Sequence, residues 1–255
     1  MRALGTVIEM PEDGLSPNEY YVGLLDYYDH WNSVDVRLQP HHRRLSPLAW
    51  TIGRDIVHMA TYVHEILTRN TPEKMWDGAS LVTIAAMTEG FLVTCRSCCD
   101  AIGQSLSYVA SEKPGQAPAD GLRALADWAK KNPRRVHSEV LDLISSDLDW
   151  FWKLRTLRDY IVHLDADANI FTDREQYYLW VHSSRSGWIT REPLLPLLAR
   201  KLSGLTSLSN EAARIINRLI NMPADRVRSR VVSGILIPSL HELIDVAPSY
   251  AKPSP

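Results

Sequence analysis

The sequence predicts a mainly α-helical protein, a helical bundle that carries a β-hairpin after one of its later helices. Apolar residues recur at helical spacing in several long segments, of which 81–109 is the longest. Aromatic and β-branched residues dominate 176–181, and the turn-forming segment 183–187 follows, which is the pattern of a hairpin. With 255 residues, of which 45% are hydrophobic and 23% are charged, the chain can also bury a sizeable core.

The N-terminal part contains a loose arm and two predicted helices. Residues 1–16 are interrupted by Gly and Pro and form the arm. Residues 16–19, Ser-Pro-Asn-Glu, have the pattern of a helix start, because Ser can cap a helix, Pro suits the first helical position and Glu stands three residues after the cap. We expect this helix to end at residues 40–44, a basic segment that fits either an exposed, solvated loop or a phosphate contact. The pair Ser46-Pro47 is then expected to open a second helix that runs to about residue 69.

A long central helix follows, and it holds all the cysteines. Asp77 or Ser80 can cap it, and its apolar residues keep helical spacing for about 30 residues. Asp100 and Gln104 interrupt the apolar residues, and hydrogen bonds to a neighbouring helix are their expected role. The cysteines are Cys95, Cys98 and Cys99. Without a second Cys or His pair nearby they do not match a zinc site, so we expect buried small residues, with a redox or metal role as the alternative.

Two short helices, at about 120–131 and 136–145, are predicted after a polar connection at 111–120. Basic residues cluster between these helices: Lys130, Lys131, Arg134 and Arg135. This cluster fits either a solvated surface or a groove that steers RNA toward the protein.

The functional interpretation depends on the next predicted helix, residues 147–163. Its apolar side is the stripe of Trp150, Leu154, Leu157 and Ile161. Arg155, Asp159 and His163 follow one another four residues apart on roughly the opposite side. Arg158 lies beside this row, so an arginine pair, a carboxylate and an imidazole gather in the last two turns of one helix. Such groups can bind a planar anion such as phosphate and transfer a proton.

The C-terminal part contains the hairpin, a long helix and an extension. A polar turn at 165–169 precedes the hairpin, which we place at about 171–190. A helix is predicted from 192 to 221, with Gly204 as its weak point. In the extension, 223–255, the segment VVSGILIP fits a helix or a strand, and the last residues, APSYAKPSP, are expected to be disordered.

Charge and hydropathy limit the cellular compartments and the binding partners that fit this sequence. Lys and Arg total 28 and Asp and Glu total 30, a net charge of -2, so any RNA contact has to be local. No apolar run approaches the roughly 18 residues of a membrane span, and the N-terminal residues do not have the anatomy of a signal peptide. We therefore expect a cytoplasmic protein without a membrane partner.

Arg158, Asp159 and His163 spell Arg, a polar residue, three further residues and then His, and this arrangement resembles the RxxxxH motif of the HEPN superfamily. The resemblance covers roughly residues 46–222, including the aromatic-rich lead-in at 149–152 and the hairpin. It implies a HEPN-like helical domain, which we place at 17–222, between the arm and the extension. It also implies a metal-independent endoribonuclease without a cofactor that acts on RNA as a homodimer, in defence or stress response. A regulatory protein partner is a further expectation.

Within this resemblance, His163 would move the proton of an attacking ribose 2′-hydroxyl, and Arg158 would stabilise the charge that develops on the phosphate. Asp159 would orient the imidazole, and Arg155 would assist Arg158 in binding the substrate. Positions 158 and 163 differ by about 140° around a helix, so one protomer does not point both side chains squarely at one phosphate. Two copies across a two-fold axis would complete the site, which is compatible with the dimer that the family implies.

Other interpretations stay open on the sequence. Arg155 and Asp159 can form an ordinary ion pair, with His163 well placed at a helix C-terminus. The chain can instead be a non-catalytic HEPN module that dimerises and binds RNA, nucleotide or protein, or a helical scaffold. In HEPN toxins paired with a nucleotidyltransferase antitoxin, a modified tyrosine stands two residues after the motif histidine. That residue is Asp165 here, which does not support a toxin-antitoxin role.

Overall fold

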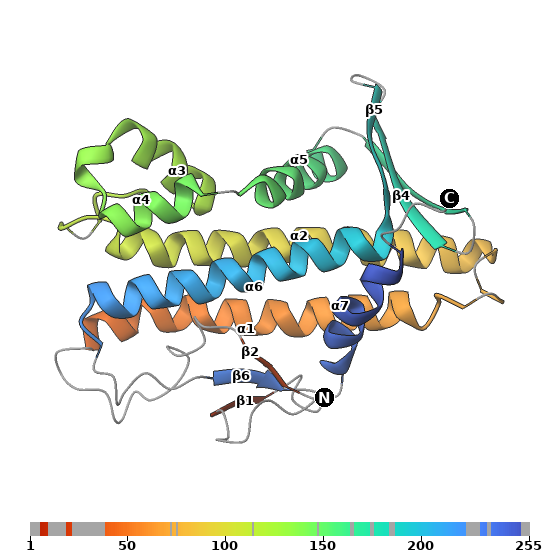
Figure 1. Cartoon of the computed structure of the whole chain (residues 1–255), viewed down its shortest axis with the longest axis horizontal. Helices are drawn as coiled ribbons and strands as arrows, with labels where there is room; N and C mark the ends of the chain where they lie inside the picture. The colour runs from red at the N-terminus through yellow and green to blue at the C-terminus, as the bar shows by residue number, and fades with distance from the viewer. Residues whose placement is uncertain are drawn as a thin grey trace. The chain divides into compact units, whose positions relative to one another are not determined.

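The computed structural model describes residues 6–9, 19–21, 39–71, 73–74, 76–113, 115–146, 148–163, 166–173, 176–183, 187–222, 230–233 and 236–250 (Figure 1). It is mainly α-helical, as the sequence predicts, and contains two short antiparallel sheets, one of which includes the predicted hairpin. The chain divides into two compact units, and the long helices contribute residues to both. Unit 1 contains Met1–Ile56, Ser97–Leu148 and Leu205–Gly234, and unit 2 contains Val57–Arg96, Asp149–Gly204 and Ile235–Pro255.

The long helices are α1 (Gln39–Leu67), α2 (Gly78–Val109) and α6 (Leu194–Leu219). α2 confirms the predicted central helix, and Asp77 caps it as expected. The backbone N–H of Ser80 donates to Asp77 Oδ2 over 3.0 Å, and that of Ala79 donates to Oδ1 over 3.3 Å. The Ser80 hydroxyl donates to the same carboxylate, and these bonds lower the pKa of Asp77.

The prediction for residues 40–47 was wrong, because the supposed loop and the supposed helix start both lie inside α1. Pro40 is the second residue of the helix, where a proline removes no hydrogen bond. Pro47 lies further inside, where a backbone donor is lost. Leu45 and Ala49 on either side of it are buried, and this burial holds the helix together through the proline.

A small sheet in unit 1 corrects the predictions for both chain ends. β1 (Thr6–Glu9) and β2 (Glu19–Tyr21) each pair antiparallel with β6 (Arg230–Ser233), in the order β1-β6-β2. Residues 6–9 are therefore not a loose arm, and Glu19–Tyr21 does not begin a helix. The helix-start pattern is local, whereas these strands pair with a segment distant in sequence. The rest of that predicted helix, 22–38, lies outside the described residues.

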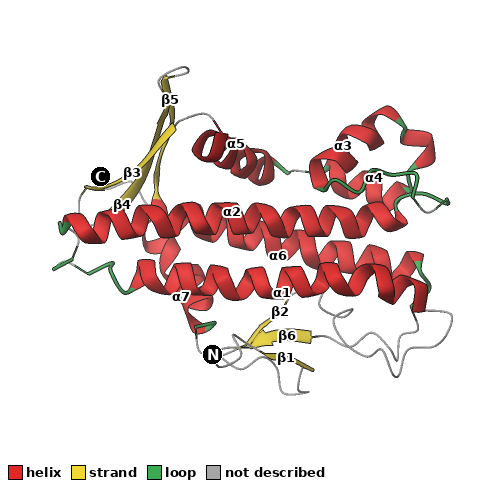
Figure 2. Cartoon of the chain, turned by 180° about the vertical axis from the view of Figure 1, so that it is seen from behind, coloured by secondary structure: helices red, strands yellow, loops and turns green. Residues whose placement is uncertain are grey.

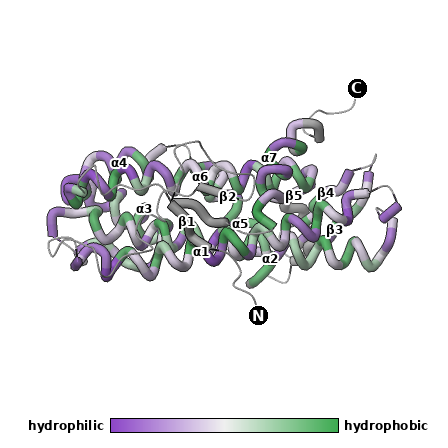
Figure 3. Tube along the Cα trace, turned by 90° about the horizontal axis from the view of Figure 1, so that it is seen from below, coloured by the Kyte–Doolittle hydropathy of each residue, from purple (hydrophilic) through white to green (hydrophobic). Residues whose placement is uncertain are grey.

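The remaining helices of unit 1 are short and match the predicted pair. They are α3 (Leu122–Lys131) and α4 (Ser138–Ser145), joined by the 3₁₀ helix η2 (Pro133–Arg135). Figure 2 shows them separated by loops, and hydrophobic and hydrophilic residues alternate around them in Figure 3. Their buried side includes Leu122, Leu125 and Val140, so one face of each helix belongs to the core of unit 1.

Unit 2 contains the predicted hairpin as part of a larger sheet. The strands β3 (Ala166–Asp173), β4 (Gln176–Ser183) and β5 (Gly187–Pro193) form an antiparallel sheet in the order β3-β4-β5. The polar turn predicted at 165–169 was wrong for 166–169, which pair with the end of β4. Alternate residues of β4, Tyr177, Leu179 and Val181, are buried, which fixes the register of the sheet.

The C-terminal extension is also more ordered than predicted. After β6, which resolves VVS of the ambiguous segment as a strand, α7 (Pro238–Tyr250) forms in unit 2. Leu240 and Leu243 of α7 are buried, and Ser239 Oγ lies 3.2 Å from His64 Nδ1 of α1. The expected disorder was therefore wrong for 247–250, and residues 251–255 lie outside the described part.

α2 is long and apolar enough to cross a membrane by length and composition alone. The sequence does not show this as an uninterrupted apolar run, because Glu89, Arg96 and Asp100 interrupt α2. Core helices of soluble proteins pass the same test, so the signal is weak. In this chain α2 supplies buried residues such as Phe91 and Ile102 to the cores of the two units.

Candidate functional site

The site predicted from the sequence lies on α5 (Asp149–His163), which begins unit 2's second segment. Of the predicted apolar side, Leu154 and Leu157 are buried, whereas Trp150 and Ile161 are half-buried. Phe151, which the prediction did not include, is also buried. The Arg96 guanidinium lies 5.0 Å from the centre of the Phe151 ring, a cation–π contact. The Trp150 ring packs where a side chain at Gly204 would be, so this glycine lets α5 approach α6 closely.

The charged cluster on α5 joins three of the four predicted residues. Arg155 Nη2 lies 3.2 Å from Asp159 Oδ2, and Arg158 Nη1 donates to Asp159 Oδ1 over 3.1 Å. Their side chains are 26%, 30% and 29% exposed for Arg155, Asp159 and Arg158, so water and ligands can reach them. Two guanidinium groups and one carboxylate leave an excess positive charge. Both oxygens of Asp159 contact arginines. The pair with Arg155 agrees with the ion-pair alternative, whereas the contact with Arg158 was not predicted.

His163 is the last residue of α5, one turn after Asp159. Its side chain lies outside the described residues, as does Asp165. The proton-transfer role of His163 and the orienting role of Asp159 toward it therefore stay predictions.

The start of α5 is held by a buried lysine that the sequence analysis missed. Lys201 of α6 is 2% exposed, and its Nζ donates to the Trp150 carbonyl over 3.0 Å. Burial lowers the pKa of Lys201 to about 8, although Glu192 acts in the opposite direction. The signal was in the sequence, because position 201 falls on the apolar side of a helix, three residues after Leu198 and four before Leu205.

The basic cluster predicted between the short helices is divided in the structure. Arg134 and Arg135 line a polar cavity of about 390 Å³ together with Lys113 and His137. The backbone N–H of His137 donates to the Ala110 carbonyl over 2.9 Å, which joins the two chain segments that form this cavity. All four basic residues are exposed, which agrees with the predicted solvated surface. Glu112 also lines the cavity, and RNA binding there stays a prediction.

The cysteines are free and fully buried, as expected. Cys98 directs its thiol at the Ile52 carbonyl over 3.9 Å, and burial raises its pKa well above the ordinary value, with Asp55 as a further cause. A thiol with a raised pKa is a poor nucleophile, which favours the packing role over the redox role. Within the described ranges, no group of His, Cys, Asp or Glu residues is placed to hold a metal ion.

Comparisons with protein-family models, curated proteins and solved structures find no match to this chain. The functional interpretation consequently depends on the residues of α5 and on the cavities of unit 1.

Proposed function

We propose that this chain is a cytoplasmic, metal-independent endoribonuclease of HEPN type that acts as a homodimer, in defence or stress response. The observation that carries the proposal is the cluster on α5, where Arg155 and Arg158 contact Asp159 at 3.2 and 3.1 Å, one turn before His163. An excess of positive charge on partly exposed guanidinium groups is what binding of an RNA phosphate requires.

The reaction would proceed by attack of a ribose 2′-hydroxyl on the adjacent phosphorus. The hydroxyl proton passes to a neutral His163 imidazole, and the bond from phosphorus to the 5′-oxygen breaks. A protonated imidazole, supplied by the second protomer, gives the 5′-oxygen its proton. The products are a 2′,3′-cyclic phosphate and a 5′-hydroxyl. Arg158 and Arg155 would stabilise the negative charge on the pentavalent phosphorus that forms during the reaction.

A second function is favoured by one observation, the double contact of Asp159. Because both of its oxygens already contact arginines, a substrate phosphate has to compete with this carboxylate for Arg158. The second function is that of a HEPN module that dimerises and binds RNA, nucleotide or a regulatory protein without cleaving RNA. This function does not require a phosphate to displace Asp159 from Arg158.

Cleavage of a mixed-sequence single-stranded RNA in EDTA tests the proposed function. We expect His163→Ala and Arg158→Ala to lower the cleavage rate by about 10²-fold or more, the range for a lost proton-transfer group or charge stabiliser. The wild type is expected to leave cyclic phosphate ends.

Arg123→Ala is the matched control. Arg123 lies 3.4 Å from Asp127 at the same four-residue spacing as Arg155 and Asp159, but on α3 and outside the motif. Its removal should leave cleavage unchanged. An inactive wild type, or a His163→Ala variant as active as the wild type at equal dimer content, would contradict the endoribonuclease proposal and leave the binding module.

A further inference from the structure

Unit 1 contains a second cavity of about 390 Å³, which is apolar over most of its lining. Pro47 and Leu48 of α1 line it, together with Ala117 and Ala119 from the connection between α2 and α3. Its polar lining residues are Arg44, Gln104, Ser107 and Tyr108. Its volume falls within the range of small-molecule sites, roughly 300–1,000 Å³, and an apolar lining with a few polar groups is typical of them.

One polar group of this cavity is buried without a partner. Ser107 is 3% exposed, and its hydroxyl has no hydrogen bond to the described residues. Leaving a buried hydroxyl unpaired is unfavourable, and groups left this way in a native structure call for an explanation. Gln104, one turn before Ser107 on α2, forms no hydrogen bond with the described part of the chain either. A ligand in the cavity could satisfy both side chains.

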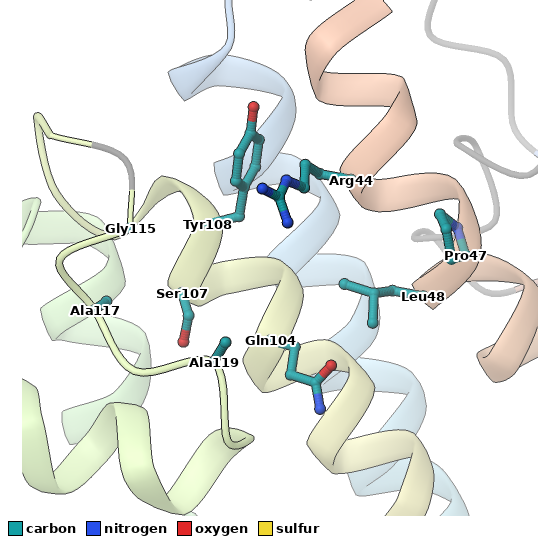
Figure 4. Close-up of a pocket in the computed structure, with 9 residues that line it drawn as sticks. All are labelled: Arg44, Pro47, Leu48, Gln104, Ser107, Tyr108, Gly115, Ala117 and Ala119. Atoms are coloured by element: carbon teal, nitrogen blue, oxygen red, sulfur yellow. The ribbon is translucent and has the colours of Figure 1, made fainter.

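The other polar groups lie at a different part of the cavity. Figure 4 shows the Arg44 guanidinium beside the Tyr108 ring, with the ends of Gln104 and Ser107 directed away from that pair. Arg44 forms no ion pair among the described residues, and it is exposed. The Tyr108 hydroxyl lies 3.0 Å from His41 Nδ1, which fixes the phenol. The cavity thus offers a cation at one end and an amide with a hydroxyl at the other.

We propose that this cavity binds a nucleoside monophosphate, with its phosphate at Arg44 and its base edge at Gln104 and Ser107. An arginine matches a phosphate geometrically, and an amide offers the adjacent donor and acceptor that a base edge requires. The apolar walls between the two ends suit the faces of a base. The site does not depend on the proposed cleavage of RNA, because none of its residues belongs to α5.

Calorimetric titration of the full chain with AMP, CMP, GMP and UMP tests the proposal. We expect saturable binding of at least one of them, with adenosine and inorganic phosphate each binding at least about tenfold more weakly than the best nucleotide. Arg44→Gln should lower the affinity for that nucleotide at least about tenfold, which is the scale of a lost hydrogen bond to a charged group. Gln104→Leu should change the order of preference among the four bases.

Arg43→Gln is the matched control, because Arg43 is the exposed neighbour of Arg44 on α1 and is not a lining residue. It should bind the nucleotide as the wild type does. Absence of binding by all four nucleotides would overturn the proposal, as would equal binding by Arg44→Gln and Arg43→Gln. Binding of inorganic phosphate as tight as that of the nucleotides would also overturn it, since the apolar walls would then play no part.

Discussion

The charged cluster on α5 and the cavity beside Arg44 are opposite kinds of site. In the cluster, both oxygens of Asp159 contact arginines, so the charges stabilise one another without a ligand. In the cavity, the Ser107 hydroxyl is buried without a partner in the described residues. The paired charges of the cluster stabilise the folded chain without a ligand. A ligand that hydrogen-bonds to the unpaired hydroxyl of the cavity would instead lower the free energy of the folded chain when it binds. The two sites should therefore respond differently to mutation.

The largest effect is expected where α2 packs against the start of α3, just after the connection that lines the cavity. Gly103 of α2 lies against the backbone of Gly121 and Leu122, at the start of α3, and a methyl group there would overlap both. Because backbone atoms cannot rotate away, Gly103→Ala has to displace α3. We expect a loss of about 3 kcal/mol or more in the free energy of unfolding, measured by urea denaturation.

Gly78→Ala is the control for this prediction. Gly78 is the first residue of α2, and an added methyl group there would meet no atom within 4 Å. Its stability should stay within about 1 kcal/mol of the wild type. Equal stability of the two variants would mean that α2 and the start of α3 do not approach closely at Gly103.

The next effect concerns Lys201, which supports α5. Its pKa falls from 10.5 to about 8 in the folded chain, so the unfolded chain binds more protons between these pH values. The contribution of Lys201 to stability should therefore rise with pH across that window, by up to about 3 kcal/mol. The Lys201→Met variant should lose this rise, as measured by urea denaturation from pH 7 to pH 10.5.

The same change at Lys130, which is exposed on α3, provides the comparison. Lys130→Met should keep the rise of the wild type. Burial raises the pKa of Cys98, Tyr108 and Tyr177, and these groups lower stability as the pH rises through the same range. The test is therefore the difference between the wild type and Lys201→Met. A difference that stays constant between pH 8 and pH 10.5 would show that Lys201 is solvated and that α5 does not depend on a buried amine.

The helices and the charged cluster on α5 show how much of the structure the sequence could predict. The spacing of apolar residues was sufficient to predict α2 and α5, because burial of one helical face is a local pattern. The same pattern contained Lys201, which was overlooked as an ordinary charged residue. For the motif, the spacing predicted that Arg155 and Asp159 could meet, and they do.

The failures have a different origin. Pro47 and the start signal at 16–19 are valid local signals, but the packing around Leu45 and the pairing of β2 with β6 override them. The cavity could not be predicted, because its walls come from α1, α2 and the connection before α3. Only Gln104, a polar residue among apolar ones, pointed toward it.

A smaller effect is expected for RNA binding at the polar cavity of Arg134 and Arg135. Replacing both by Gln should lower the slope of log affinity against log salt by about 1.4, since each phosphate contact on a single strand contributes about 0.7. Fluorescence anisotropy with a 2′-O-methyl RNA measures this without cleavage. The matched control replaces Lys130 and Lys131, which are exposed but do not line the cavity. An equal change in both double variants would assign the binding to diffuse charge rather than to the cavity.

The smallest effect should come from the cluster on α5 itself. A double-mutant cycle with Arg155→Gln and Asp159→Asn is expected to give a coupling of about 0.5 kcal/mol, the value for a partly exposed pair four residues apart. Asp159→Asn should cost more than Arg155→Gln, because it leaves Arg155 and Arg158 without the carboxylate between them.

The size of this coupling separates the two interpretations of α5. A weak coupling together with a strong loss of cleavage in Arg155→Gln would mean that the arginine contributes to phosphate binding far more than to the helix. A coupling above about 2 kcal/mol with unchanged cleavage would mean that the cluster is structural, since networks of that strength are rare among exposed pairs. The chemistry would then have to be sought at the cavity beside Arg44, where the buried Ser107 hydroxyl has no hydrogen-bond partner within the described part of the chain.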